Sequence, residues 1–119
     1  MIAGSIKLKV QLLRGEDPAI GPGKAMVLEA IDRNGSISAA GRALGMSYRR
    51  VWLLVDALNR DWSEPVVETR IGGGKERGAH LTGFGRQLLA RYRDLETRMM
   101  SAAEEADREW FARAMRRPA

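Results

Sequence analysis

The stretch GSISAAGRALGMSYRRVWLLVDAL, residues 35–58, decides the fold. Ala40 and Gly41 provide small residues where two helices must approach closely, and Gly45 falls at a turn that requires a positive φ. An apolar stripe at helical spacing begins at Val51. These features together predict a helix-turn-helix unit. A plain helical hairpin can carry a similar pattern of small residues, so that alternative stays open here.

Four residues point outward at the start of the second helix of this unit: Ser47, Tyr48, Arg49 and Arg50. That end of the helix enters the major groove in DNA-binding helix-turn-helix proteins. The two arginines have no acidic residue three or four positions away, so a salt bridge on the helix surface does not explain them. We expect them to contact phosphate or guanine, the alternative being a solvated face. Trp52, next to the stripe, is interpreted as core or interdomain packing.

Serines lie at the expected helix starts. Ser36 or Ser38 can cap the first helix of the unit, and Ser47 can cap the second. A capping hydroxyl can also lie near a phosphate, so Ser36 and Ser38 belong to the predicted DNA-binding set.

The distribution of charge supports this prediction. The 119 residues carry a formal net charge of +5. Residues 33–93 hold eleven basic and five acidic side chains, whereas residues 1–32 hold four of each and residues 94–119 hold five and six. The positive excess therefore coincides with the motif, where it would favour binding to phosphates.

Composition narrows the class of protein. The length predicts a single domain over residues 1–119, with a DNA-binding core at 1–82 and a helix at 83–119. The absence of cysteine excludes disulfides and thiolate metal sites and favours a cytoplasmic location. The amino-terminal residues do not resemble a signal peptide, and no apolar run approaches the length that spans a membrane.

Catalysis is not expected. His80 is the only histidine, so the sequence cannot form a histidine cluster or a Cys–His pair. The acidic residues are scattered, whereas carboxylate chemistry needs them to converge in a cleft. We therefore predict no enzyme, no catalytic residue, no metal and no cofactor, and we interpret His80 as a plain strand residue.

A hairpin is predicted directly after the helix-turn-helix unit. The β-branched run Val66–Ile71 and the segment Ala79–Leu81 read as strands, and GGGKERG separates them. In a winged helix, Lys75 and Arg77 at this tip would lie over a phosphate strand or reach a minor groove. A nucleotide-phosphate loop is the weaker alternative, because Glu76 follows the lysine and the loop leads into a strand.

The amino-terminal third is predicted to add a strand and a helix. Apolar and polar residues alternate over Ile6–Leu12, which is the period of a half-buried strand. We expect this strand to join the hairpin as its third strand, since an isolated hairpin is marginally stable. GEDPAIGPG should break regular structure, and a helix should run from Lys24 to Arg33, with Asn34 and Gly35 as its stop.

A long final helix is expected from Gly83 to Met115, capped by Thr82. It would be roughly 50 Å long at about 1.5 Å per residue, more than one domain can cover. Its apolar residues follow a heptad pattern, so we predict a homodimer that places two recognition helices about one DNA turn apart. The predicted dimerisation residues are Leu88, Tyr92, Leu95, Met99, Ala102, Ala106 and Trp110.

Three segments, GSISAAGRALGMSYRRVW, VVETRIGGGKERGAHLT and GFGRQLL, are similar to the DNA-binding domain of ModE-type molybdate-responsive transcription regulators. The resemblance covers about residues 5–100, and GSISAAGRALG also resembles LysR-type domains more distantly. It implies a dimer on operator DNA, with Ser47–Arg50 in the recognition helix and Lys75 and Arg77 in the wing. Full-length ModE regulators add molybdate-binding β-barrel domains after the helix. The chain ends at Ala119, so we expect molybdate to act on it only indirectly, if at all.

The expected fold is mainly α with a small β-sheet: a winged helix-turn-helix followed by a long dimerisation helix. The expected function is sequence-specific binding of double-stranded DNA in transcription regulation, with no membrane partner. A winged-helix module that binds other proteins is the alternative, because such folds also dock on proteins.

Overall fold

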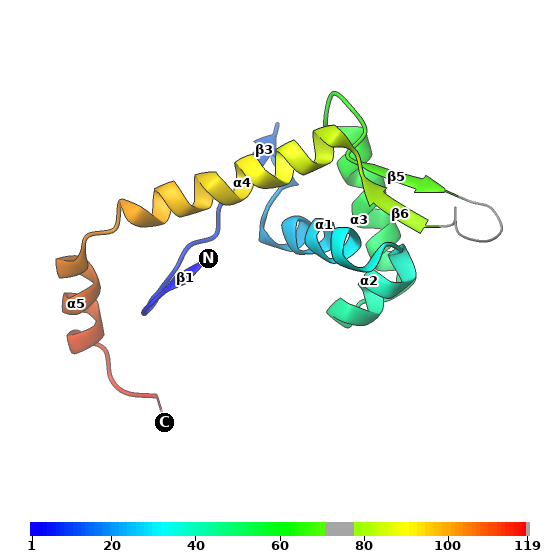
Figure 1. Cartoon of the computed structure of the whole chain (residues 1–119). Helices are drawn as coiled ribbons and strands as arrows, with labels where there is room; N and C mark the ends of the chain where they lie inside the picture. Colours follow the sequence, from blue (N-terminus) through cyan, green and yellow to red (C-terminus); the bar gives the residue numbers. More distant parts are fainter. Residues whose placement is uncertain (71–77, 119) are drawn as a thin grey trace.

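Three packed helices form the core of the molecule, which we describe from a computed structural model over residues 1–70 and 78–118; the last two helices of the chain extend away from this core (Figure 1). The core helices are α1 (Pro22–Asn34), α2 (Ile37–Leu44) and α3 (Tyr48–Asp61). Leu28 and Ile31 of α1 and Val51 and Leu58 of α3 are fully buried between them. The expected apolar stripe of α3 thus faces the core.

α1 is slightly longer than expected because Pro22 begins it. Proline suits the first turn of a helix, where its missing N–H leaves no bond unmade. At the other end Gly35 takes φ 74°, and its N–H donates to the Ile31 carbonyl at 2.8 Å. Gly35 therefore ends the helix as predicted, by adopting the left-handed conformation that glycine tolerates best.

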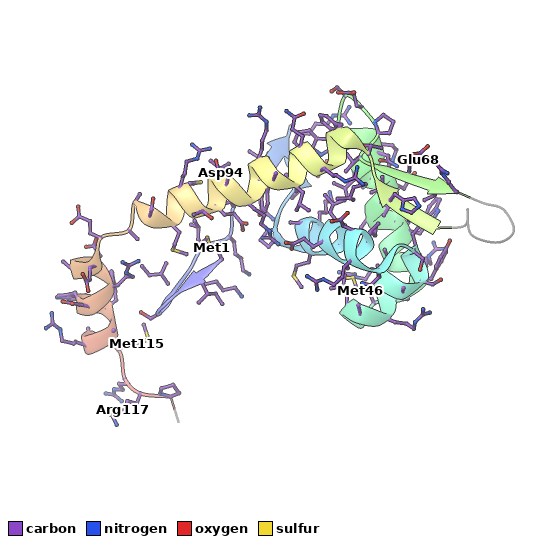
Figure 2. All side chains as sticks on the ribbon, in the orientation of Figure 1. Met1, Met46, Glu68, Asp94, Met115 and Arg117 are labelled. Carbon is purple, nitrogen blue, oxygen red and sulfur yellow. The ribbon has the colours of Figure 1, made fainter. Side chains whose placement is uncertain are left out.

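The elbow between α2 and α3 matches its prediction closely. Gly45 has φ 68°, and its turn leads into Met46, which Figure 2 labels. A Cβ placed on Gly41 would lie 2.7 Å from the Met46 carbonyl oxygen, so the crossing has room for glycine only. Ser36 caps α2 by accepting from the Ala39 N–H at 3.0 Å. The alternative of a plain helical hairpin is therefore wrong, and the fold is a helix-turn-helix with a wing.

The wing is an antiparallel pair, β5 (Val67–Arg70) and β6 (Gly78–Leu81), in which Glu68 is opposite His80. Asn59 on α3 anchors its base: the side-chain oxygen accepts from the N–H groups of Val66 and Val67 at 2.8 and 3.0 Å, and the side-chain amide donates to the Val67 carbonyl at 3.0 Å. The wing therefore starts at a fixed place beside the second half of α3.

The amino-terminal segment does not extend the wing, contrary to the prediction. It forms two hairpins of its own, β1 (Ile2–Ala3) with β2 (Ile6–Lys7), and β3 (Leu12–Arg14) with β4 (Asp17–Ile20). Part of GEDPAIGPG is thus a strand, because Gly15 with φ 64° closes a tight turn.

Each edge of the wing already has a partner. The Gly35 carbonyl accepts from the Ala79 N–H at 3.0 Å on the β6 side, and Asn59 binds the β5 side. A third strand would have to displace one of these contacts.

The final helix was predicted to be continuous, but the structure shows that it is interrupted. It consists of α4 (Gly83–Ser101) and α5 (Glu105–Ala114), which Figure 1 shows at an angle to each other. The last turn of α4 tightens, with the Ala102 N–H donating to the Met99 carbonyl at 3.2 Å. A new helix then starts beside acidic residues, which favour a helix N-terminus.

Thr82 caps α4 as expected. Its hydroxyl accepts from the Gly85 N–H at 2.9 Å and donates to the Pro65 carbonyl at 2.6 Å. The Thr82 N–H donates to the Val66 carbonyl at 3.0 Å, which joins the start of α4 to the base of the wing.

α4 is held on the rest of the molecule by a buried row of side chains one turn apart: Tyr92, Glu96 and Met100. The Tyr92 hydroxyl donates to the Val10 carbonyl at 2.6 Å. Arg93 forms ion pairs with Glu29 of α1 and with the buried carboxylate of Glu96.

Of the helices in the described ranges, none has the length and apolar character needed to cross a membrane.

Candidate nucleic-acid interface

The exposed start of α3 is the centre of the candidate site. Ser47 lies just before the helix, and its hydroxyl accepts from the Arg50 N–H at 3.1 Å, which makes it the predicted cap. Tyr48, Arg49 and Arg50 follow, and all three side chains are exposed. The structure therefore brings the four predicted recognition residues together on the surface.

The two arginines differ from the other charged side chains of α3. In the described part of the chain, the ion pairs of α3 lie in its second half, between Asp56 and Arg60 and between Asp61 and Arg14. No ion pair of the described residues involves Arg49 or Arg50. Two unpaired guanidinium groups at the capped end of a helix can bind an anion without first breaking a contact.

Trp52 corrects an expectation. It is 46% exposed, so it is not a core residue, and Tyr48 one turn earlier is 57% exposed. The core alternative is wrong because Val51 and Val55 supply the buried stripe and Trp52 lies outside it, whereas interdomain packing stays a prediction.

A cleft of about 540 Å³ separates the start of α3 from the start of α2 and from the end of β5 and the start of β6 in the wing. Its lining residues come from these three elements: Ser36, Ile37, Ser38, Tyr48, Trp52, Thr69, Arg70, Gly78 and Ala79. None of them is acidic. The two predicted serines of α2 therefore lie on the same side of the molecule as the recognition residues, and Ser36 acts as the cap while Ser38 lies inside the helix.

The wing contributes one residue that the sequence analysis missed. Arg70 ends β5 and lines the cleft. Its place just before a glycine-rich tip is a usable signal, because basic residues near a wing tip are suited to phosphate contact. Lys75 and Arg77 lie outside the described residues.

The predicted dimerisation residues separate into two groups. Leu88 and Leu95 are half-buried against the core, and Tyr92 is buried inside its own chain by its contact with Val10. Tyr92 therefore has no surface to offer a second chain. The other four residues are exposed: Met99, Ala102, Ala106 and Trp110. They do not form one seam, because the helix is interrupted after Ser101.

Groups suited to catalysis or metal binding do not converge in the described residues. His80 is exposed on β6 opposite Glu68 of β5, consistent with a plain strand residue. Within residues 1–70 and 78–118 no three acidic or histidine side chains lie together in a way that could hold a metal ion.

The helix-turn-helix and the wing lie in a part of the chain that matches a known family. Residues 24–86 match the family described as bacterial regulatory helix-turn-helix proteins of the lysR family. The chain belongs to this family. The matched range starts in α1 and ends just after Thr82, so it contains the helix-turn-helix and the wing of this LysR-type domain.

Curated relatives confirm the resemblance to ModE. The molybdenum transport protein ModE of Azotobacter vinelandii is 37% identical over 86 residues, which are 72% of this chain and 32% of that protein. The molybdenum-pterin-binding protein MopA of Rhodobacter capsulatus is 36% identical over 93 residues, which are 78% of this chain and 35% of that protein. This LysR-type chain thus spans about a third of the length of the curated relatives it matches.

A solved structure shows the same fold. The crystal structure of the CbnR DNA-binding domain in complex with DNA superposes with a TM-score of 0.54 at 25% identity, covering 76% of this chain and 94% of that one. The mainly α winged helix-turn-helix predicted from the sequence is therefore confirmed.

Proposed function

We propose that this chain is the DNA-binding part of a transcription regulator and binds duplex DNA in a sequence-specific manner. The observation that carries the proposal is the pair Arg49 and Arg50, exposed and unpaired at the start of α3 within the described structure. Membership of a regulator family and the similarity to a DNA complex support it. A regulator needs no catalytic residue, and we assign none.

The shape of the site suggests how DNA would bind. The first turn of α3 enters the major groove, where the guanidinium groups of Arg49 and Arg50 reach guanine edges or phosphates. The start of α2, with Ser36 and Ser38, faces the adjacent phosphate strand. For Lys75 and Arg77 the proposal rests on the sequence alone and places them on the backbone or in a minor groove.

We further propose that the protein acts as a homodimer. Four large apolar side chains are exposed to water in the single chain: Met99 on α4, Trp110 and Phe111 on α5, and Met115 directly after α5. A second copy would cover this apolar surface and would hold two copies of α3 on successive half-sites. The chain spans only about a third of the length of its curated relatives, and we assign no molybdate site to these 119 residues.

Binding to duplex DNA as a function of salt tests the main proposal. Affinity should fall steeply as salt rises, because phosphate contacts release counterions. Arg49→Ala and Arg50→Ala should each weaken the preferred site by about 1–3 kcal/mol and relax base preference. Lys75→Ala should instead lower the log–log salt slope by about one at any sequence.

Arg60→Ala is the matched control, since Arg60 is also an exposed arginine of α3 but pairs with Asp56 away from the cleft. It should bind DNA like the parent. If the two recognition arginines can be removed without loss, or if the parent retains no duplex at low salt, the proposal is wrong.

The dimer is tested separately by sedimentation. Met99→Glu and Trp110→Glu change exposed side chains, so each variant should fold, and the mass should fall to that of a single chain. A parent that already sediments as a monomer would contradict the dimer. Together with absent DNA binding, that result would favour a module that docks on other proteins.

A further inference from the structure

Tyr48 and Trp52 are two large aromatic side chains on the exposed face of α3, one helical turn apart. Tyr48 belongs to the predicted recognition residues, but the DNA contacts proposed above use charged and hydroxyl groups and give no role to the Tyr48 ring or to Trp52. Neither residue belongs to the core, since both keep about half of their surface in water. Exposed aromatic residues that line a cleft often mark a binding surface.

The chemistry of the cleft indicates what these aromatic residues would contact. Its base is apolar, with Ile37 and Ala79 both buried, and its rim carries Thr69 and Arg70. Among the described residues, no carboxylate lines the cleft. The surface therefore suits a ligand that is anionic along its edge and carries apolar groups beside that edge.

Duplex DNA carries such groups in the major groove. The C5-methyl of thymine is the apolar feature there, and it distinguishes an A·T pair from a G·C pair by contact rather than by hydrogen bonding. The arginines next to the aromatic residues on α3 would meet guanine or phosphate. The aromatic faces remain for a methyl group on a neighbouring base pair.

We propose that Tyr48 and Trp52 form a contact surface for thymine methyl groups, which makes Trp52 a specificity-determining residue. This inference rests on the proposed DNA-binding function. It adds the base that the site prefers next to its arginine contacts, namely a thymine positioned against α3.

Replacing thymine with deoxyuridine tests the inference without altering the protein. Preferred duplexes are first selected from a randomised library by the full 119-residue chain. Each thymine of a selected duplex is then replaced singly by deoxyuridine, which removes the methyl group and keeps the base pair. At a contacted position the affinity should fall about fourfold, the effect of burying one methyl-sized group.

Variants assign the contact to the aromatic residues. In Trp52→Ala or Tyr48→Ala the thymine and deoxyuridine duplexes should bind equally at that position, while the salt dependence stays close to that of the parent. Leu53→Ala is the matched control: Leu53 has the same 46% exposure as Trp52 on the same helix but does not line the cleft. This variant should keep the fourfold preference.

The possible outcomes are distinct. Loss of the methyl preference in the aromatic variants alone supports the inference. DNA binding that is indifferent to deoxyuridine at every position overturns it and leaves the proposed function intact, as does a preference that survives in both aromatic variants. Absence of binding to any duplex refutes the proposed function, and this inference with it.

Discussion

Gly41→Ala probes the elbow that aims α3. The added Cβ would lie 2.7 Å from the Met46 carbonyl oxygen and 3.6 Å from a methyl carbon of Val51. Alanine would favour the helix by about 0.5–1 kcal/mol. Overpacking against backbone costs about 1–3 kcal/mol, and the Met46 N–H also bonds to the Gly41 carbonyl at 2.8 Å, so the turn cannot shift freely. The net expectation is a loss of roughly 1–2 kcal/mol.

Urea unfolding and thermal melting measure this loss, which corresponds to a lower Tm by about 4 °C per kcal/mol for a domain of this size. Gly23→Ala is the control, because Gly23 also lies in a helix but a Cβ there meets nothing within 4 Å. The control should match or exceed the parent in stability. A Gly41→Ala protein as stable as the Gly23→Ala protein would refute the close crossing of α2 and α3.

Tyr92→Phe should lower the free energy of unfolding by about 1–2 kcal/mol, because it leaves the buried Val10 carbonyl without its 2.6 Å partner; an unchanged urea midpoint would contradict this. Burial, assisted by Glu96, raises the pKa of Tyr92 to about 12. The unfolded phenol titrates near 10, so unfolding releases a proton between these values, and stability should fall from about pH 10 to 12 in the parent but less in Tyr92→Phe. Arg93→Leu should cost about 2 kcal/mol because the buried Glu96 carboxylate loses its 2.7 Å partner and keeps only the N-terminal ammonium group at 3.9 Å; the double variant with Glu96→Leu should recover much of that loss, and equal losses in denaturant titrations would argue against the pair.

The elbow was predictable because its determinants are local. Gly41 is required by the close approach of the Met46 carbonyl, and Gly45 by a positive φ at the turn. Ser47 caps the helix that it immediately precedes. Thr82 and Gly35 are equally local signals, one starting and one ending a helix. These short-range rules were enough to place α3 and the wing in the right order.

The failed predictions depend on contacts between distant parts of the chain. The amino-terminal strand pattern was real, but its pairing was decided by Gly35 and Asn59, which occupy the edges of the wing. The heptad pattern after Thr82 was also real, yet Tyr92 packs within its own chain. Its hydroxyl donates to the Val10 carbonyl, 82 positions away in the sequence. A periodic pattern shows which face of a helix or strand is buried, but it does not show which segment of the chain packs against that face.

The candidate site was only partly visible in the sequence for a similar reason. Arg49 and Arg50 stood out because they lack acidic neighbours along the helix. Trp52 was interpreted as core or interdomain packing because it is a large apolar side chain, and Arg70 was not singled out. Only the fold shows that both residues line one cleft with the start of α2.

The joint between the wing and α4 has a mechanical consequence. Thr82 ties the first turn of α4 to Pro65 and Val66, and Asn59 ties Val66 to α3. Because of these hydrogen bonds, a tilt of the distal end of α4 would move α3 and the wing together. In the homodimer proposed above, such a tilt would change the distance between the two helix-turn-helix units without changing the residues at the start of either α3.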